Sequence, residues 1–122
     1  ALYQQFGPDG NGQQQLYIGI ESATGGGIIG GSLANSAVIG TGQAIPFQIG
    51  TDNNIRMTFA AAGNVGIGST NPGSKQTVLG GDVFVASSGN GIILKDDTNG
   101  NCYRVKMSGG SLVSSVIACP SS

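Results

Sequence analysis

The sequence has no histidine, no tryptophan and little charge, with charged residues at only 9% of its 122 positions. Without histidine a Ser-His-Asp triad cannot form, and two cysteines alone make a poor metal site. A net charge of −1 and a pI near 4.9 leave no basic surface of the kind that nucleic acid needs. No apolar run approaches about 18 residues, so we expect no membrane insertion. These absences favour a protein that is not an enzyme and that uses no cofactor or metal.

Glycine, in contrast, is abundant, with 23 residues, about three times its usual share. Isoleucine and valine are also frequent, which argues against disorder. Ile-Gly pairs recur about every ten residues in the first half of the chain, separated by turn-forming residues. Short apolar segments at this spacing predict an all-β structure with almost no helix. The pairs are Ile18-Gly19, Ile29-Gly30, Ile39-Gly40, Ile49-Gly50 and Ile67-Gly68.

The predicted strands are too short and too rich in glycine to form a sizeable core within one chain. Ordering the backbone costs about 1–2 kcal/mol per residue, and glycine raises that cost. Three chains wound around an axis can turn their isoleucine and valine side chains inward and pair their strand edges. We therefore predict an intertwined homotrimeric β shaft over residues 16–80, with glycines where chains cross. The expected trimer core consists of Ile18, Ile29, Ile39, Ile49, Val65 and Ile67.

Residues 56–78, RMTFAAAGNVGIGSTNPGSKQTV, resemble a segment that recurs in bacteriophage tail fibres and related trimeric fibrous adhesins. The likeness extends over residues 32–81, with Ser69 in place of the usual threonine and Gln76 in place of an expected leucine. It implies a structural fibre on the virion surface, in an extracellular setting, that mediates host attachment. Residues 1–15 would then attach the fibre to other virion proteins. A capsid decoration or cement fibre and a polysaccharide depolymerase are the alternatives.

Residues 81–122 have a different character and are predicted to form a small C-terminal tip module. Strands expected at 83–86, 92–95, 102–107 and 112–118 are separated by turns rich in Gly and Asn, which favours an antiparallel meander. If Cys102 faces Ile117 across the last hairpin, Cys119 is its diagonal neighbour. A small shift in register then allows a Cys102–Cys119 disulfide. Two free buried thiols are the alternative.

The turn near residue 96 and the strand after it carry the candidate receptor contacts. They would meet a host surface glycan or protein, although an exposed strand with one core aromatic is the simpler interpretation. A glycine pattern at Gly25, Gly27 and Gly30 matches G-x-G-x-x-G but lacks the strand, helix and acidic partner of a nucleotide site, so we interpret it as bends in the shaft. The candidate contacts are Asp96, Asp97, Asn99, Asn101, Tyr103 and Arg104.

Overall fold

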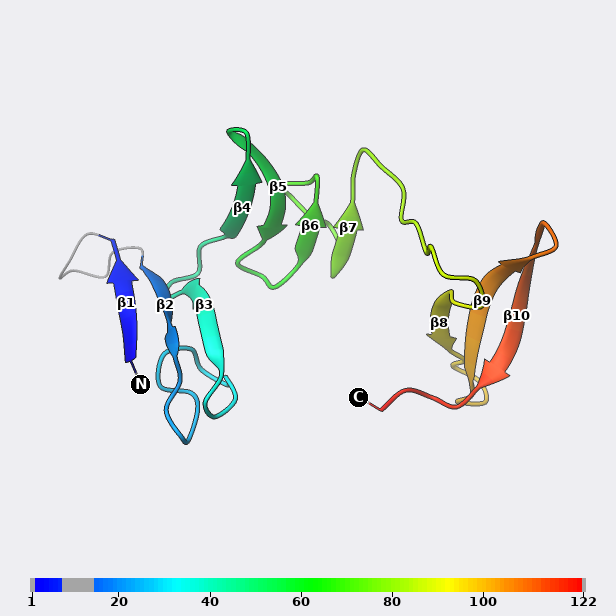
Figure 1. The fold of residues 1–122 in the computed structure, drawn as a ribbon, viewed down its shortest axis with the longest axis horizontal. Helices are drawn as coiled ribbons and strands as arrows, with labels where there is room; N and C mark the ends of the chain where they lie inside the picture. Colours follow the sequence, from blue (N-terminus) through cyan, green and yellow to red (C-terminus); the bar gives the residue numbers. More distant parts are fainter. Residues whose placement is uncertain (1, 8–14, 122) are drawn as a thin grey trace. The chain divides into compact units, whose positions relative to one another are not determined.

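The computed structural model describes residues 2–7 and 15–121, and this part of the chain contains ten β-strands and no helix (Figure 1). The predicted all-β class is therefore confirmed. The strands form three separate sheets of three, four and three strands. The chain divides into two compact units, Ala1–Asp82 with the first two sheets and Val83–Ser122 with the third.

The first sheet is antiparallel and consists of β1 (Leu2–Phe6), β2 (Leu16–Ile20) and β3 (Ala37–Thr41), in that order. Ile18 of β2 lies directly opposite Ile39 of β3. Because β1 pairs with β2 along its whole length, the start of the segment predicted for virion attachment is part of this sheet. Residues 8–14 of that segment lie outside the described residues.

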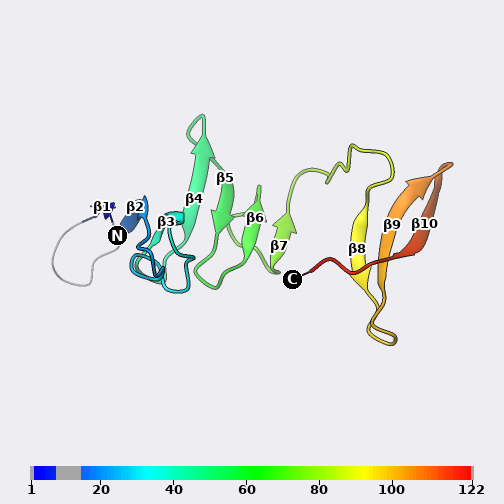
Figure 2. The same cartoon turned by 60° about the horizontal axis from the view of Figure 1, so that its bottom comes forward.

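The second sheet has the order β4-β5-β6-β7 (Figure 2). Asp52 and Asn53 connect the first two strands, both with positive φ angles, of 50° and 55°. That is the backbone of a tight two-residue hairpin, for which Asn and Asp are well suited. The β6 and β7 strands pair in parallel. The bounds are β4 (Phe47–Thr51), β5 (Asn54–Phe59), β6 (Val65–Ile67) and β7 (Gln76–Val78).

The third sheet is an antiparallel meander of β8 (Ile92–Lys95), β9 (Cys102–Ser108) and β10 (Ser111–Ile117). The two glycines between β9 and β10 have φ angles of 56° and 80°, which residues with side chains rarely adopt. Met107 faces Leu112 and Cys102 faces Ile117, so the predicted register of this hairpin is confirmed.

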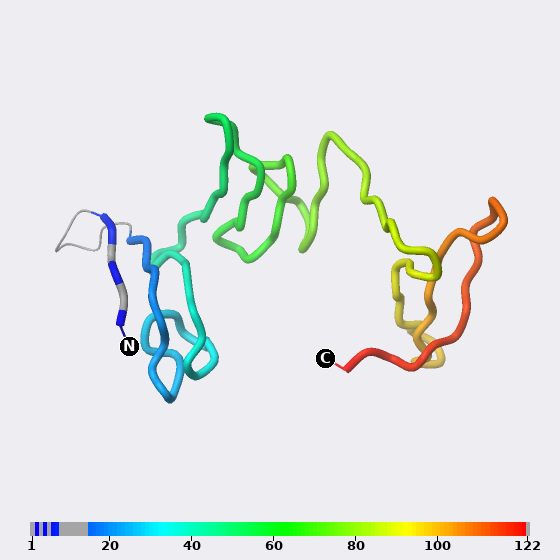
Figure 3. Tube along the Cα trace, viewed as in Figure 1, coloured from blue at the N-terminus to red at the C-terminus, as the bar shows by residue number. Residues whose placement is uncertain are grey.

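Two predicted strands are wrong. Residues 83–86 are irregular rather than extended in a sheet, and every residue from 81 to 90 is exposed. Figure 3 shows this stretch as an irregular connection between β7 and β8. No strand among residues 2–7 and 15–121 is hydrogen-bonded to it, so its Val-Phe-Val pattern lacks the partner that a strand requires. Ile29-Gly30 also lies in a loop, where the backbone N–H of Ile29 bonds to the Glu21 side chain instead of a neighbouring strand.

Candidate functional site

The second sheet buries its polar face within the chain. Thr58, Gly66 and Thr77 lie in one row across β5, β6 and β7. Thr58 is only 1% exposed, and its hydroxyl accepts a hydrogen bond of 3.1 Å from Gln48 Nε2. The chain after β6 folds beneath this row so closely that a Cβ at Gly66 would collide with the backbone carbonyl of Ser69. The segment of the chain that follows β6 therefore covers the polar side of its own sheet.

The opposite face of the second sheet is apolar and open to solvent. Phe47 faces Phe59 across β4 and β5, with ring centroids 5.8 Å apart. Ile49 and Ile67 are 46% and 41% exposed, although aliphatic side chains of this size are usually buried. This surface is called the open face of the second sheet. Its apolar residues are Phe47, Ile49, Met57, Phe59, Val65, Ile67 and Val78, and the exposed Gln76 lies on the same face opposite Val65.

The first sheet is arranged in the same way. Ile18, Ile20 and Ile39 share one face and are 44%, 51% and 52% exposed. On the other face Ile29, from the loop between β2 and β3, lies over Gly40, where a Cβ would come within 2.6 Å of its Cδ1. Both sheets of this unit thus have one side covered by their own loops and an apolar side left open.

The six predicted trimer-core residues do not all lie on open faces. Ile18 and Ile39 lie on the open face of the first sheet, and Ile49 and Ile67 lie on that of the second. Val65 shares the face of Ile67 but is half-buried. Ile29 is on the covered side of the first sheet. The structure therefore brings five of these residues onto apolar faces of strands, whereas Ile29 lies in a loop.

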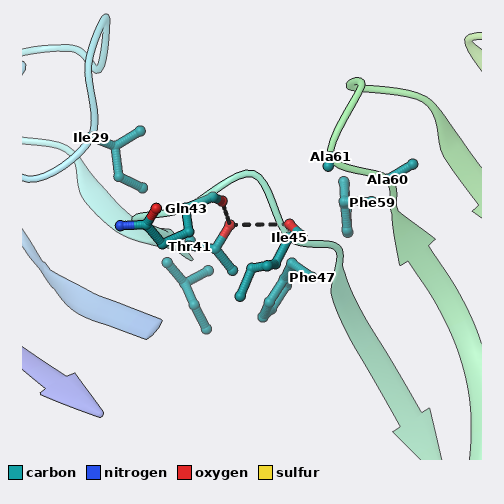
Figure 4. Close-up of a pocket in the computed structure, with 10 residues that line it drawn as sticks. Ile29, Thr41, Gln43, Ile45, Phe47, Phe59, Ala60 and Ala61 are labelled. Atoms are coloured by element: carbon teal, nitrogen blue, oxygen red, sulfur yellow. Dashed lines mark hydrogen bonds between the residues drawn. The ribbon is translucent and has the colours of Figure 1, made fainter. Parts of the chain in front are cut away.

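An apolar hollow of about 450 Å³ joins the ends of the two sheets (Figure 4). Phe47 and Phe59 of the second sheet line it, together with Ile29 and Ile45. The Thr41 hydroxyl donates to the carbonyl oxygens of Gln43 and Ile45, at 3.2 and 3.3 Å, which fixes the chain that leads from β3 to β4. The open face of the second sheet therefore continues into this hollow rather than ending at a polar rim.

Glu21 is the only glutamate, and its side chain reaches into the glycine-rich loop of residues 22–35 that follows it. Its carboxylate accepts the backbone N–H groups of Gly27, Ile28 and Ile29 at 2.9–3.1 Å, and the Ser32 hydroxyl at 2.5 Å. Consecutive N–H groups that converge in this way form an anion site, and the protein's own carboxylate fills it. Sequence reasoning missed this role, although a lone glutamate directly before a Gly-rich run was a usable signal.

The same contacts set the acidity of Glu21. Its hydrogen bond with Ser32, followed by that with the Ile29 N–H, lowers the pKa of this carboxyl from 4.5 to about 2, and burial opposes the change only in part. A group whose folded pKa is lowered stabilises the fold above its unfolded pKa. That stabilisation is therefore present above about pH 4.5 and is lost as the pH falls toward 2.

We expect Glu21→Gln to loosen this loop at neutral pH and to flatten the stability change between about pH 4.5 and 2. The amide keeps the shape but loses the charge that strengthens the hydrogen bonds. Thermal unfolding of both proteins across this pH range is the measurement. Asp82→Asn, an exposed acid in the same unit, is the matched control. If the melting temperature of the wild type changes with pH in parallel with that of Glu21→Gln, the role assigned to this carboxylate is contradicted.

The loop between β8 and β9 is held by its own side chains. Asp96 accepts the N–H groups of Thr98 and Asn99, at 2.8 and 3.2 Å, and Asn99 Nδ2 also bonds to it. Asp97 accepts the Thr98 hydroxyl, and the side-chain oxygen of Asn99 accepts the N–H of Asn101. These predicted contact residues thus shape the loop, and their role toward a receptor stays a prediction.

The last two candidate contacts lie on different faces of the third sheet. Leu94 faces Tyr103, and Ile93 faces Arg104, so the two neighbours in the chain point to opposite sides. The Tyr103 hydroxyl is 3.5 Å from Asn99 Nδ2, which places it beside the loop. Arg104 donates to the carbonyl of Gly89 at 3.4 Å. The six candidates therefore do not form a single surface.

A disulfide joins Cys102 and Cys119, whose Cα atoms are 5.1 Å apart, so this predicted pairing is confirmed. The two cysteines are separated by 17 positions in the sequence. Closing a loop of that length should contribute about 3 kcal/mol to the stability of the C-terminal unit. We expect reductant, or the double variant Cys102→Ser/Cys119→Ser, to remove this amount while leaving unfolding of residues 1–82 unchanged. Denaturant titration checks the value, and non-reducing mass spectrometry that finds two free thiols would contradict the pairing.

Neither a protein-family model nor a curated protein matches this sequence. Across residues 2–7 and 15–121, no three His, Cys, Asp or Glu side chains gather closely enough to hold a metal ion. The same part of the chain contains no helix that is long and apolar enough to cross a membrane.

Proposed function

We propose that this chain is one third of a homotrimeric virion fibre, a tail fibre or receptor-binding appendage that attaches the particle to a host surface. The observation that carries the proposal is that the N-terminal unit buries polar side chains and leaves apolar side chains exposed. Its loops cover Thr58 and Glu21, which are 1% and 3% exposed, while Ile20 and Ile39 remain more than half exposed. Apolar surface is driven out of water at about 25 cal/mol per Å², so open faces of this kind favour association.

A homotrimer can cover these exposed apolar faces. Each chain has short sheets with open edges, and a closed ring of chains can cover both the faces and the edges. At Gly66 and Gly40 a Cβ would collide with Ser69 and Ile29 of the same chain, so these two glycines allow close packing within each copy. The likeness of residues 56–78 to phage fibre segments supports a trimer over other closed rings.

Attachment would use the C-terminal unit as the displayed end of the fibre. Three weak sites on one rod raise the effective concentration of the second and third contacts without any new interaction. The disulfide between Cys102 and Cys119 suits an extracellular setting, because such bonds persist under oxidising conditions.

Sedimentation of the purified chain tests the assembly. We expect a trimer at micromolar concentration that resists heat and detergent. A folded, stable monomer under these conditions would refute the fibre.

Removal of residues 83–122 then separates attachment from assembly. The shortened chain should still sediment as a trimer but should no longer bind host cells. If it binds as well as the full chain, residues 83–122 are not the attachment site and the C-terminal unit has a purely structural role.

A further inference from the structure

The connection that leads from the N-terminal unit into the C-terminal unit, traced in Figure 3, exposes an aromatic side chain. Phe84 is 86% exposed, and its neighbours Val83 and Val85 are 66% and 44% exposed. Among residues 2–7 and 15–121, no hydrogen bond reaches the backbone of residues 81–86. This stretch therefore presents both its side chains and its main-chain groups to solvent.

Phe84 differs in this respect from the other aromatic residues of the chain. The sequence has four phenylalanines and three tyrosines. Six of these seven residues lie within strands, where hydrogen bonds to a neighbouring strand hold the backbone. These six are Tyr3, Phe6, Tyr17, Phe47, Phe59 and Tyr103. Phe84 is the one aromatic residue on unpaired backbone.

Exposed backbone without a partner is what an endopeptidase requires of its substrate. Such enzymes bind the substrate as an extended strand through its main-chain groups, and a pocket for one side chain decides where they cut. The valines on either side of Phe84 favour an extended backbone, and residues 81–90 contain no proline that would restrict it. A strand within a sheet must open before it can bind in this way, which lowers its cleavable fraction. The enzyme thus supplies the partner strand that residues 83–86 lack.

The position of the disulfide determines what a cut in this stretch releases. Cys102 and Cys119 are the only cysteines, and both follow Phe84 in the sequence. No covalent bond then joins the two products, and the C-terminal product keeps its cross-linked hairpin. The N-terminal product keeps the first two sheets complete. A single cut therefore separates two units that each retain their own strand pairing.

We propose that the peptide bond between Phe84 and Val85 is a cleavage site for endopeptidases whose specificity pocket accepts an aromatic side chain. The oxygen of a water molecule bonds to the carbonyl carbon of Phe84, the bond from this carbon to the Val85 nitrogen breaks, and a proton passes to the new amino group. The products are residues 1–84, with a new carboxylate, and residues 85–122. Cleavage here does not depend on the proposed attachment function. On a fibre of that kind it detaches the displayed end from the particle.

Limited digestion of the full-length chain with chymotrypsin, followed by mass spectrometry, is the test. The first cut should give residues 1–84 and 85–122, at least about tenfold faster than any cut at an aromatic residue within a strand, because a strand is cleavable only in its open fraction. The two products should separate on size exclusion without reductant. A first cut at an aromatic residue within a strand would overturn the proposal. Products that stay together after complete cleavage would overturn the release of the C-terminal unit.

Phe84→Lys distinguishes a lost recognition side chain from an inaccessible segment. Residues 81–90 contain no Lys or Arg, so trypsin should leave this stretch of the wild type intact. In the variant trypsin should cut after position 84 and chymotrypsin should not, while so exposed a substitution leaves the fold unchanged. Val85→Pro, added to either chain, is the matched control and should block both cuts, because the proline ring restricts the backbone on the leaving side of the bond.

Sedimentation and circular dichroism establish that each chain is folded and assembled before digestion. If chymotrypsin spares the folded wild type and trypsin spares folded Phe84→Lys, the segment is covered and the proposal is refuted. That result would indicate that another copy of the chain pairs with residues 83–86.

Discussion

Replacing Ile67 with Asp should prevent assembly of the chain at micromolar concentration. Ile67 is 41% exposed on the open face of the second sheet, so the single chain has room to solvate a carboxylate there. In a closed trimer the same position would bring three charges together away from water. Burial of an unpaired charge costs several kcal/mol, and the cost is paid three times. The expected product is a monomer or an aggregate in place of the trimer, measured by analytical ultracentrifugation.

Thr70→Asp is the control for this experiment. Thr70 is exposed, and it lies three residues further along in the loop that covers the other side of the sheet. It adds the same charge to each chain away from the open face, so this variant should sediment like the wild type. If Ile67→Asp also assembles normally, the open face of the second sheet is not the contact between copies.

The second large effect is expected from Gly66→Ala. A methyl group at this buried position would collide with the backbone carbonyl of Ser69, which cannot rotate away as a side chain does. Overpacking of this kind costs about 1–3 kcal/mol, and we expect the upper end or more. The loop would have to leave the row of Thr58 and Thr77, exposing polar groups that are now satisfied. The free energy of unfolding from denaturant titration is the measurement.

Gly73→Ala separates this collision from the general effect of losing a glycine. A Cβ at Gly73 would meet nothing within 4 Å, and its φ angle is not in the left-handed region. Alanine there should be neutral or stabilise by about 0.5 kcal/mol, through the unfolded chain. Equal losses for Gly66→Ala and Gly73→Ala would show that close packing beneath the second sheet is not the cause.

Local chemistry explains which parts of the fold could be predicted. The tip hairpin was foreseen with its register because Gly109-Gly110 marks a two-residue turn, which both glycines form with positive φ angles, and this turn places Cys102 opposite Ile117. Val65 and Gly66 point to opposite faces of their sheet, as the alternation of a strand requires.

The strands that were wrongly predicted depend on contacts with other parts of the chain. Ile29-Gly30 has the same two residues as the pairs that do form strands, yet the Glu21 carboxylate, eight residues before Ile29, accepts the backbone N–H of Ile29. Residues 83–86 have a strand pattern but no partner strand in the part of the chain that the structure describes. Tyr103 and Arg104 are neighbours in a strand, so alternation alone predicts that they lie on different faces. The prediction of a single contact surface placed them together because both lie close in sequence to the same loop.

The open apolar faces also determine what a stability measurement on this protein means. If three copies close these faces, folding and association are one equilibrium, and the chain concentration enters it to the second power. Each tenfold dilution then removes about 2.7 kcal/mol of stability per trimer. A melting temperature therefore describes the chain only at a stated concentration. Chains anchored at one point of a particle keep a fixed local concentration, so there the fibre holds its stability however dilute the particles become.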